Sequence, residues 1–127
     1  MIPPTVLADR ISTVDAAAIL TYDAVRSVRE HRIGGWLERV GCAVGSAELV
    51  KATVHEERPD HSDRQSFWSE HTAVAAVSSF PYGLAFGISV TVDVGSLRVV
   101  SRKHWAWDTL AGAAAGAACS RLDRRTP

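Results

Sequence analysis

Residues 69–83 read SEHTAVAAVSSFPYG and carry the clearest helix signal of the chain. Ser69 stands where a helix N-cap belongs, and Glu70 falls in the first turn, where a negative charge favours the helix dipole. An apolar segment follows. Pro81 then disfavours helical geometry at the preceding residue, and Gly83 permits a positive φ angle. The stretch therefore predicts a helix that begins after Ser69 and a reversal of the chain at its end.

The segments upstream also show helical spacing. Residues 13–32 predict a first helix, with a capping box at Ser12 and apolar side chains every three to four positions. Gly34 and Gly35 are expected to break it. A second helix then continues to about residue 53.

Downstream, Leu84–Val94 is rich in β-branched and small residues, which is typical of a strand. No other segment offers a partner strand, so we expect a helix there. A last helix is expected from about Trp105 through AGAAAGAAC, whose small residues allow a neighbour to pack closely. The sequence thus predicts an all-α fold, a compact bundle of four to five helices with the active site at helix ends and loops.

The length of 127 residues and a hydrophobic content of 46% fit one domain. We expect an irregular N-terminus over residues 1–12, a single helical domain over 13–120 and a basic tail over 121–127. Cys42 and Cys119 are too few for a disulfide framework and lack metal-ligand spacing, so both are interpreted as small buried residues.

Charge and hydropathy exclude several classes of protein. Fourteen basic and fourteen acidic residues give a formal net charge of zero, so no global field attracts nucleic acid. A mean hydropathy of +0.02 and 22% charged residues disfavour a polytopic membrane protein. The N-terminus shows no basic residue before Arg10 and no apolar run of signal length, and we expect a cytoplasmic or membrane-associated protein.

Three clusters of polar residues have spacings that suit the binding of an anion. The first is Lys51-x6-Arg58-Pro59, at the end of the second helix and the start of a polar loop over 55–64. Alone, a lysine at a helix C-terminus is ordinarily a solvated charge that favours the helix dipole. Long polar loops in compact domains nevertheless tend to carry function.

The second cluster is SFWSEHT, residues 66–72. A hydroxyl, the free amides of a helix N-terminus and an imidazole lie within one turn here, and such a group binds phosphate oxygens and can donate a proton. The alternative is an ordinary serine cap beside an exposed histidine.

The third cluster is Arg98-x5-His104-x3-Asp108. Because His104 and Asp108 are four residues apart, they share a face if they lie on one helix, and the carboxylate can hold one ring nitrogen while the other points outward. That arrangement makes an imidazole a nucleophile or a base.

Taken together and in this order, the clusters resemble the signature of the type 2 phosphatidic acid phosphatase family. Its superfamily also includes bacterial acid phosphatases and vanadium haloperoxidases. The family pattern is Lys-x6-Arg-Pro, then Pro-Ser-Gly-His, then Ser-Arg-x5-His-x3-Asp. The resemblance covers about residues 34–119, and DTLAGAAAG and AELVK are also similar to the family. This chain departs from the pattern in having Trp68 for Pro, Glu70 for Gly and Leu97 for Ser.

The resemblance implies a role for each matching residue. His104 would attack phosphorus and form a phosphohistidine, Asp108 would orient it, and His71 would protonate the leaving oxygen. The phosphoryl oxygens would be held by Lys51, Arg58, Ser69, the main chain at Glu70, and Arg98. Three cations can neutralise a phosphoryl group, so we expect no metal and no cofactor, with phosphate or vanadate able to occupy the site.

Glu70 admits two interpretations. At the first position of its helix it can point outward and favour the helix dipole while its N–H stays available. Alternatively, its negative charge beside the site marks a degenerate pocket that no longer turns over.

Many members of the family lie in membranes, but the segment between His71 and Arg98 is too short for that. It must leave the site and return, which allows about 13 residues per arm, or roughly 20 Å of helix against a hydrocarbon core of about 30 Å. Apolar surface left by so few helices would be covered by peripheral membrane contact or by a second copy of the chain.

The function implied by the resemblance is metal-independent hydrolysis of phosphate monoesters through a phosphohistidine. The partner would be a phosphorylated small molecule or a lipid, isoprenyl phosphates included. Two alternatives remain: a vanadate-dependent haloperoxidase, and a non-catalytic helical binding or scaffold protein with a decayed phosphate pocket.

Overall fold

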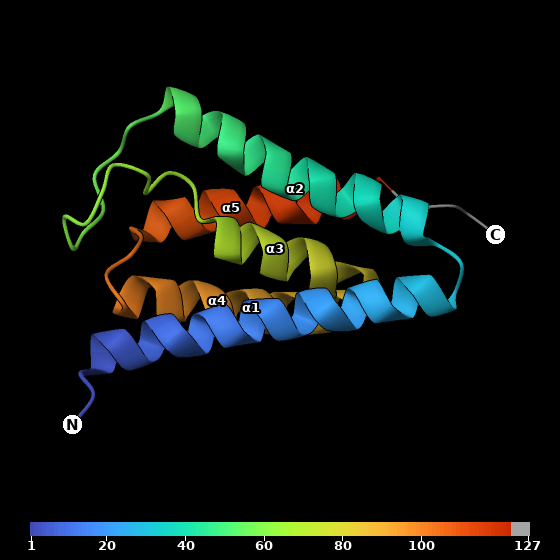
Figure 1. Ribbon diagram of the computed structural model, residues 1–127, viewed down its shortest axis with the longest axis horizontal. Coiled ribbons are helices and arrows are strands. Elements are labelled where there is room, and N and C mark those ends of the chain that lie inside the picture. The colour runs from blue at the N-terminus through green and yellow to red at the C-terminus, as the bar shows by residue number, and fades with distance from the viewer. Residues whose placement is uncertain (123–127) are drawn as a thin grey trace.

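The computed structural model describes residues 1–122, and over that range the chain forms five α-helices and no β-strand. The helices are α1 (Pro4–Arg29), α2 (Ile33–Thr53), α3 (Glu70–Ser79), α4 (Leu84–Val100) and α5 (Ala106–Cys119), with a 3-10 turn, η1 (Phe80–Tyr82), after α3. Figure 1 shows the helices side by side, with a long loop between α2 and α3 at one end. The predicted all-α bundle is confirmed, including the helix over Leu84–Val94, which continues to Val100. Residues 123–127 of the predicted basic tail lie outside the described part.

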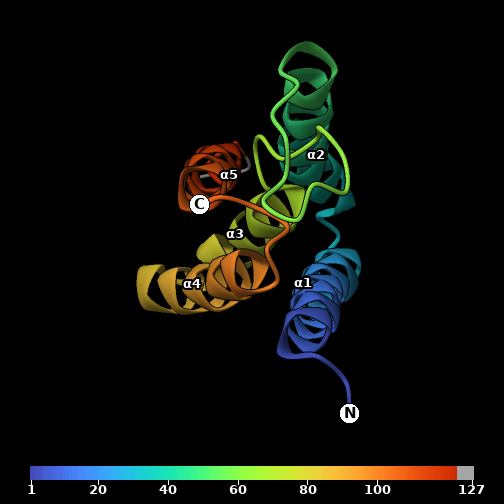
Figure 2. The ribbon, with the colours of Figure 1, turned by 90° about the vertical axis from the view of Figure 1, so that its left-hand side faces the viewer.

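Helix α3 is the centre of the bundle. It contacts all four other helices, and Figure 2 shows it between α2, α1, α4 and α5. Its residues from Thr72 to Ser79 are all buried. The helix begins as predicted, because the Ser69 side chain accepts a hydrogen bond from the Thr72 N–H at 3.2 Å.

Helix α5 packs directly on the backbone of α3 through two glycines. A Cβ atom at Gly112 would collide with the Ser69 carbonyl oxygen, and one at Gly116 would collide with the Ala73 carbonyl oxygen. Only a residue without a side chain permits this approach. The close packing predicted for the AGAAAGAAC segment is therefore confirmed.

The N-terminal expectations were wrong. Helix α1 begins at Pro4, so most of the segment 1–12 is helical and Ser12 lies inside the helix. Pro4 occupies the first helical turn, where its missing N–H costs no hydrogen bond. Ser12 does not cap a helix; its hydroxyl donates to the Asp9 carbonyl at 2.8 Å. The turn after α1 involves His31, with a φ of 57°, rather than the two glycines, which lie in the first turn of α2.

The two cysteines were also predicted wrongly, because Cys42 of α2 and Cys119 of α5 form a disulfide with their Cα atoms 5.7 Å apart. They are 77 residues apart in sequence, so no local pattern could pair them. The bond lies against the apolar cluster of Ala43, Ala73 and Val77, where α2, α3 and α5 meet. The loop that it closes contains all eight residues predicted for the site.

The outer faces of α4 and α5 are apolar. Their exposed large apolar side chains are Leu84, Phe86, Ile88, Val92, Val99 and Val100 on α4 and Trp107 and Leu110 on α5. Across residues 1–122, no helix has the combination of length and hydropathy that a membrane span requires. Coverage of this face by a second copy or by a membrane surface stays a prediction.

Candidate active site

The residues predicted for the site lie at one end of the bundle. There the loop between α2 and α3 meets the start of α1 and the connection from α4 to α5 (Figure 1). Two contacts hold the loop against that connection: the Asp60 N–H donates to the Arg102 carbonyl at 3.0 Å, and the Lys103 ammonium pairs with the Asp60 carboxylate at 2.8 Å. The loop is therefore part of the packed structure.

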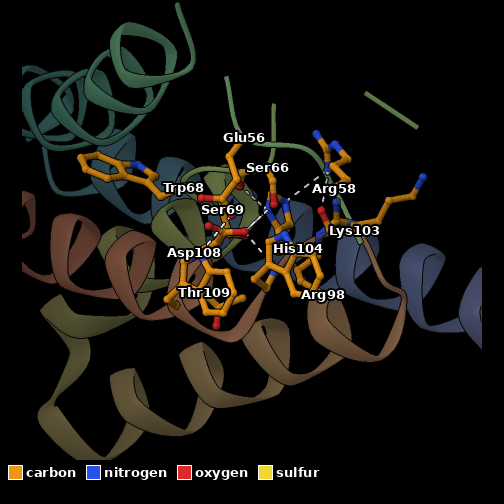
Figure 3. Close-up of polar contacts among 12 residues, drawn as sticks. Glu56, Arg58, Ser66, Trp68, Ser69, Arg98, Lys103, His104, Asp108 and Thr109 are labelled. Carbon is orange, nitrogen blue, oxygen red and sulfur yellow. Dashed lines mark hydrogen bonds and ion pairs between the residues drawn. The ribbon is translucent and has the colours of Figure 1, made fainter. Parts of the chain in front are cut away.

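His104 is buried in this end of the bundle, with 2% of its surface exposed. Its Nδ1 lies 2.6 Å from the Ser66 carbonyl oxygen. A carbonyl oxygen can only accept a hydrogen bond, so Nδ1 carries the proton and Nε2 presents its lone pair. Nη1 of Arg58 lies 3.4 Å from Nε2 (Figure 3). Burial and the charges of Arg98 and Arg58 lower the pKa of His104 to about 3, which keeps the ring neutral.

Asp108 is fully buried beside His104, but it does not hold the ring as predicted. The distance from Nδ1 of His104 to Oδ2 of Asp108 is 3.9 Å, too long for a hydrogen bond. Oδ2 instead accepts from the Ser66 hydroxyl and from the Trp105 N–H, the latter at 2.9 Å. The four-residue spacing failed because α5 begins at Ala106, so His104 precedes the helix that carries Asp108.

Ser66 connects the two residues and was missed as a site residue. Its hydroxyl binds Asp108 and its carbonyl binds His104, so one residue fixes both the carboxylate and the tautomer of the imidazole (Figure 3). The sequence placed Ser66 inside the second polar cluster, but nothing in a sequence shows where a main-chain carbonyl points.

The three predicted cations surround the imidazoles, and each is bound to an oxygen of the protein. Lys51 donates to the carbonyls of Gln65 and Trp68 at 3.1 Å and 2.9 Å. Nε of Arg58 binds the Asp63 carboxylate at 2.6 Å. Burial lowers the pKa of Lys51, and the charge of Arg58 lowers it further, so the two cations of the Lys-x6-Arg spacing lie within electrostatic range of each other.

Arg98 is the most deeply buried of the cations, with 3% of its surface exposed. Its Nη1 donates to the Asp9 carboxylate and lies 3.4 Å from the Ser12 hydroxyl. Its Nε, also buried, has no acceptor among residues 1–122. Burial lowers the pKa of Arg98, and the neighbouring Asp9 opposes that effect. The N-terminal helix thus supplies the counter-ion of a predicted phosphate-binding residue.

His71 lies in the first turn of α3 and contacts Thr13 of α1. The Thr13 hydroxyl donates to the Asp9 carbonyl at 3.0 Å, so its oxygen accepts from Nε2 of His71 at 3.3 Å. Nε2 of His71 therefore carries a proton. Burial and the charge of Arg98 lower the pKa of His71 to about 4, while Asp9 raises it. His71 is thus neutral near pH 7 and bears an N–H that points at Thr13.

Ser69 and Glu70 are occupied by other partners. The Ser69 hydroxyl oxygen accepts from the N–H and the hydroxyl of Thr72, which makes it a cap for α3. Glu70 is the first residue of α3 and is half-buried. Burial and the nearby carboxylate of Glu48 raise the pKa of Glu70, and Lys51 lowers it. The side chain therefore sits among charged neighbours instead of pointing fully into solvent.

Asp9, Ser12 and Thr13 are the residues that sequence reasoning did not connect with the site. Their spacing of three and four positions places them on one face of α1, and that pattern was the available signal. It was lost because Ser12 was assigned to the start of a helix.

The arrangement can hold an anion and move a proton. A neutral imidazole presents a lone pair on Nε2 to an arginine, two more cations lie nearby, and a second imidazole offers an N–H. Among residues 1–122, no group of three His, Cys, Asp or Glu side chains is placed to hold a metal ion.

The chain matches no protein-family model, no curated protein and no solved structure. The likeness of its three clusters to the phosphatase signature therefore stays a prediction, and the function is argued from the geometry.

Proposed function

We propose that this protein is a metal-independent phosphatase that hydrolyses phosphate monoesters through a phosphohistidine at His104. The observation that carries the proposal is the state of that imidazole. The Ser66 carbonyl fixes the proton on Nδ1, and Nε2 faces the guanidinium of Arg58. A neutral nucleophile directed at a cation is what attack on a phosphoryl group held by that cation requires.

Substrate binding requires the cations to exchange their present partners for phosphoryl oxygens. Arg58 would either release Asp63 or bind Asp63 and the phosphate at the same time, since a guanidinium has five N–H donors. Arg98 would bind with its unused Nε or by releasing Asp9. A phosphate dianion also favours protonated imidazole, so bound substrate raises the pKa of His71 from its low value and populates the imidazolium that can give a proton to the leaving oxygen.

The reaction would proceed in two displacements. Nε2 of His104 attacks phosphorus, the bond from phosphorus to the ester oxygen breaks, and His71 gives its proton to that oxygen. The phosphorylated ring keeps the proton on Nδ1, and its positive charge is stabilised by the Ser66 carbonyl and by the Asp108 carboxylate 3.9 Å away. His71, neutral after giving up its proton, then takes a proton from a water molecule that attacks phosphorus. The bond from phosphorus to Nε2 breaks, which releases inorganic phosphate and restores His104.

A non-catalytic phosphate-binding bundle is the second candidate. It is favoured by the burial of His104 and by the protein oxygens that already occupy Lys51, Arg58 and Arg98. Such a protein would bind phosphate or vanadate without turnover.

The experiment is hydrolysis of p-nitrophenyl phosphate by the purified protein and by two alanine variants. His104→Ala should lose all activity above background. His55→Ala is the matched control, because His55 is an exposed histidine of the same loop that has no place in the site, and it should retain full activity.

Three other outcomes contradict the proposal in different ways. Equal hydrolysis by wild type and His104→Ala would place the reaction elsewhere. Phosphate binding without hydrolysis, measured by calorimetry, would favour the non-catalytic candidate. Oxidation of bromide by peroxide only after addition of vanadate would favour a haloperoxidase.

A further inference from the structure

The Asp108 carboxylate has one oxygen that the hydrogen bonds described above leave out. Oδ2 accepts from Ser66 and from the main chain of Trp105. Oδ1 is buried as well, and within residues 1–122 it has no hydrogen-bond donor while Glu56 is ionised. A buried carboxylate oxygen without a donor is costly, so a native structure rarely leaves one unpaired.

Glu56 is the neighbour that can supply the missing donor. Its side chain lies beside Asp108 and Ser66 in Figure 3. Two further contacts fix its position: the Glu56 carbonyl accepts from the Ser66 N–H at 3.0 Å, and its Oε1 accepts from Nε1 of Trp107 at 3.0 Å. Trp107 and Asp108 are adjacent at the start of α5, so the indole anchors the Glu56 carboxyl near Asp108, and the two carboxyl groups lie within hydrogen-bonding range.

We propose that Glu56 is a positioning residue that stands as a neutral carboxylic acid and donates a hydrogen bond from its carboxyl group to Oδ1 of Asp108. The pair then shares one proton and one negative charge. The shared proton does not depend on any reaction, whereas the effect of Glu56 on catalysis rests on the proposed function of His104.

The charges around the pair are consistent with one retained proton. Burial and the adjacent Asp108 carboxylate raise the pKa of Glu56, and the hydrogen bond from Trp107 lowers it. Three cations act on the neighbouring His104 and lower its pKa, namely Lys51 of α2, Arg58 of the loop and Arg98 of α4. Positive charge near a carboxyl group favours its ionisation. The proton is held against them because two carboxylates in contact cannot both ionise cheaply.

The protonation state of Glu56 affects His104 through Ser66. With Glu56 neutral, both oxygens of Asp108 have donors, and Oδ2 is held toward the Ser66 hydroxyl. The same serine carries the carbonyl that fixes the tautomer of His104. Loss of the Glu56 proton as the pH rises puts a second negative charge against Asp108 and pushes the pair apart, which loosens Ser66 and then the imidazole.

Infrared spectroscopy tests the proton directly. At about pH 6, above the ordinary glutamate pKa of about 4.3, wild type should show the absorption of a protonated carboxyl group that Glu56→Gln lacks. Because the pKa values of Asp15 and Glu70 are raised too, the readout is the intensity lost in the variant. Glu57→Gln is the matched control: it removes the exposed neighbouring carboxylate, which pairs with His61, and should keep the band.

Activity measurements test the positioning role. Glu56→Gln keeps an N–H donor for Asp108 and should retain kcat within about twofold near pH 7. Glu56→Ala should lower kcat by about 10- to 100-fold with little change in KM, the loss expected for one hydrogen bond to a buried charge. A fall in kcat with rising pH that is present in wild type should be absent or displaced in Glu56→Gln, because glutamine does not ionise.

Two results would overturn the inference. An unchanged carboxyl band in Glu56→Gln would show that Glu56 carries no proton. Equal kcat and pH profiles in wild type, Glu56→Ala and Glu56→Gln would show that it positions nothing. Absence of hydrolysis by wild type would defeat the proposed function instead, and the infrared comparison would still decide whether the pair shares a proton.

Discussion

Asp9 of α1 binds the guanidinium of Arg98 of α4, although the two residues lie 89 positions apart in the chain. The arginine is buried, and the carboxylate is partly exposed. Asp9 therefore occupies a position on Arg98 that a bound phosphate would have to take or share. The N-terminal helix thus both neutralises Arg98 and competes with an anion for it.

Replacing Asp9 by asparagine should strengthen the binding of phosphate or vanadate. The change keeps the shape of the side chain and removes its charge, so the anion no longer competes with a carboxylate for Arg98. We expect Kd for orthovanadate to fall by about tenfold. That change corresponds to the free energy of one charge-assisted hydrogen bond, the one from Arg98 to the Asp9 carboxylate, which no longer has to be broken. Titration calorimetry measures it.

Asp15→Asn serves as the control, since Asp15 lies on the same helix but interacts with Asp93 of α4. It should leave Kd unchanged. A Kd for Asp9→Asn equal to or weaker than that of wild type would show that Asp9 does not compete with the ligand.

The disulfide should contribute strongly to stability. It closes a loop of 77 positions between Cys42 and Cys119. On chain-entropy arguments, a loop of that length is worth about 4 kcal/mol in the free energy of unfolding. Urea unfolding of wild type should therefore shift to much lower denaturant on reduction, and the double variant Cys42→Ser, Cys119→Ser should match the reduced protein. Identical midpoints with and without reductant would contradict the pairing.

The glycines of α5 should be intolerant of alanine where the helix touches α3. Gly112→Ala places a methyl group against the Ser69 carbonyl and should cost about 2 kcal/mol or more of unfolding free energy. At Gly45 of α2, by contrast, an added Cβ meets no atom within 4 Å in the described part of the chain. Gly45→Ala should stabilise the protein by up to about 1 kcal/mol. Urea titrations of both variants check the contrast, and equal effects would mean that α5 does not approach α3 so closely.

The two buried imidazoles should make the protein less stable in mild acid. The pKa of His71 is lowered to about 4 and that of His104 to about 3. Between those values and about 6.5 the unfolded chain binds protons that the folded chain does not, so stability falls as the pH falls. From pH 7 to pH 5 we expect the two histidines to remove about 2 to 4 kcal/mol.

Three carboxyl groups with raised pKa values, Asp15, Glu56 and Glu70, act in the opposite direction, because the folded state holds their protons more tightly. The measurement is therefore the difference in unfolding free energy between pH 7 and pH 5 in wild type and in His104→Gln. The difference should be smaller in the variant. An equal difference in the two proteins would mean that His104 titrates normally.

Local chemistry made much of the fold predictable. Ser69 caps α3, the small residues of α5 allow close packing, and α4 is helical because no strand partner exists in the described chain. The predicted start of the first helix was wrong because Ser12 and Asp15 fit a capping box as well as they fit the interior of a helix. Only tertiary contacts distinguish these two placements. Pairing of Cys42 with Cys119 depends on how α2 and α5 pack, which no local pattern encodes.

For the site, the structure places Lys51, Arg58, Arg98 and the two imidazoles at one end of the bundle, while their roles stay predictions. The inner contacts could not be predicted in the same way. The Ser66 carbonyl is a main-chain group with no residue preference, and Asp108 reaches His104 through it because a helix boundary falls between them. Asp9 and Glu56 were missed because isolated carboxylates are common on surfaces. Only their contacts across the fold, with Arg98 and with Trp107, distinguish these two.

The most direct test of the proposed phosphohistidine mechanism is the chemistry of the bound phosphate after rapid mixing with a phosphate monoester. Wild type should form a transient covalent phosphoprotein whose bond is stable in base and labile in acid, as a phosphorus–nitrogen bond is. Peptide mapping should place it on His104, and His104→Ala should not form it. An acid-stable phosphoprotein, a label on another residue, or turnover by His104→Ala at the wild-type rate would contradict the central claim.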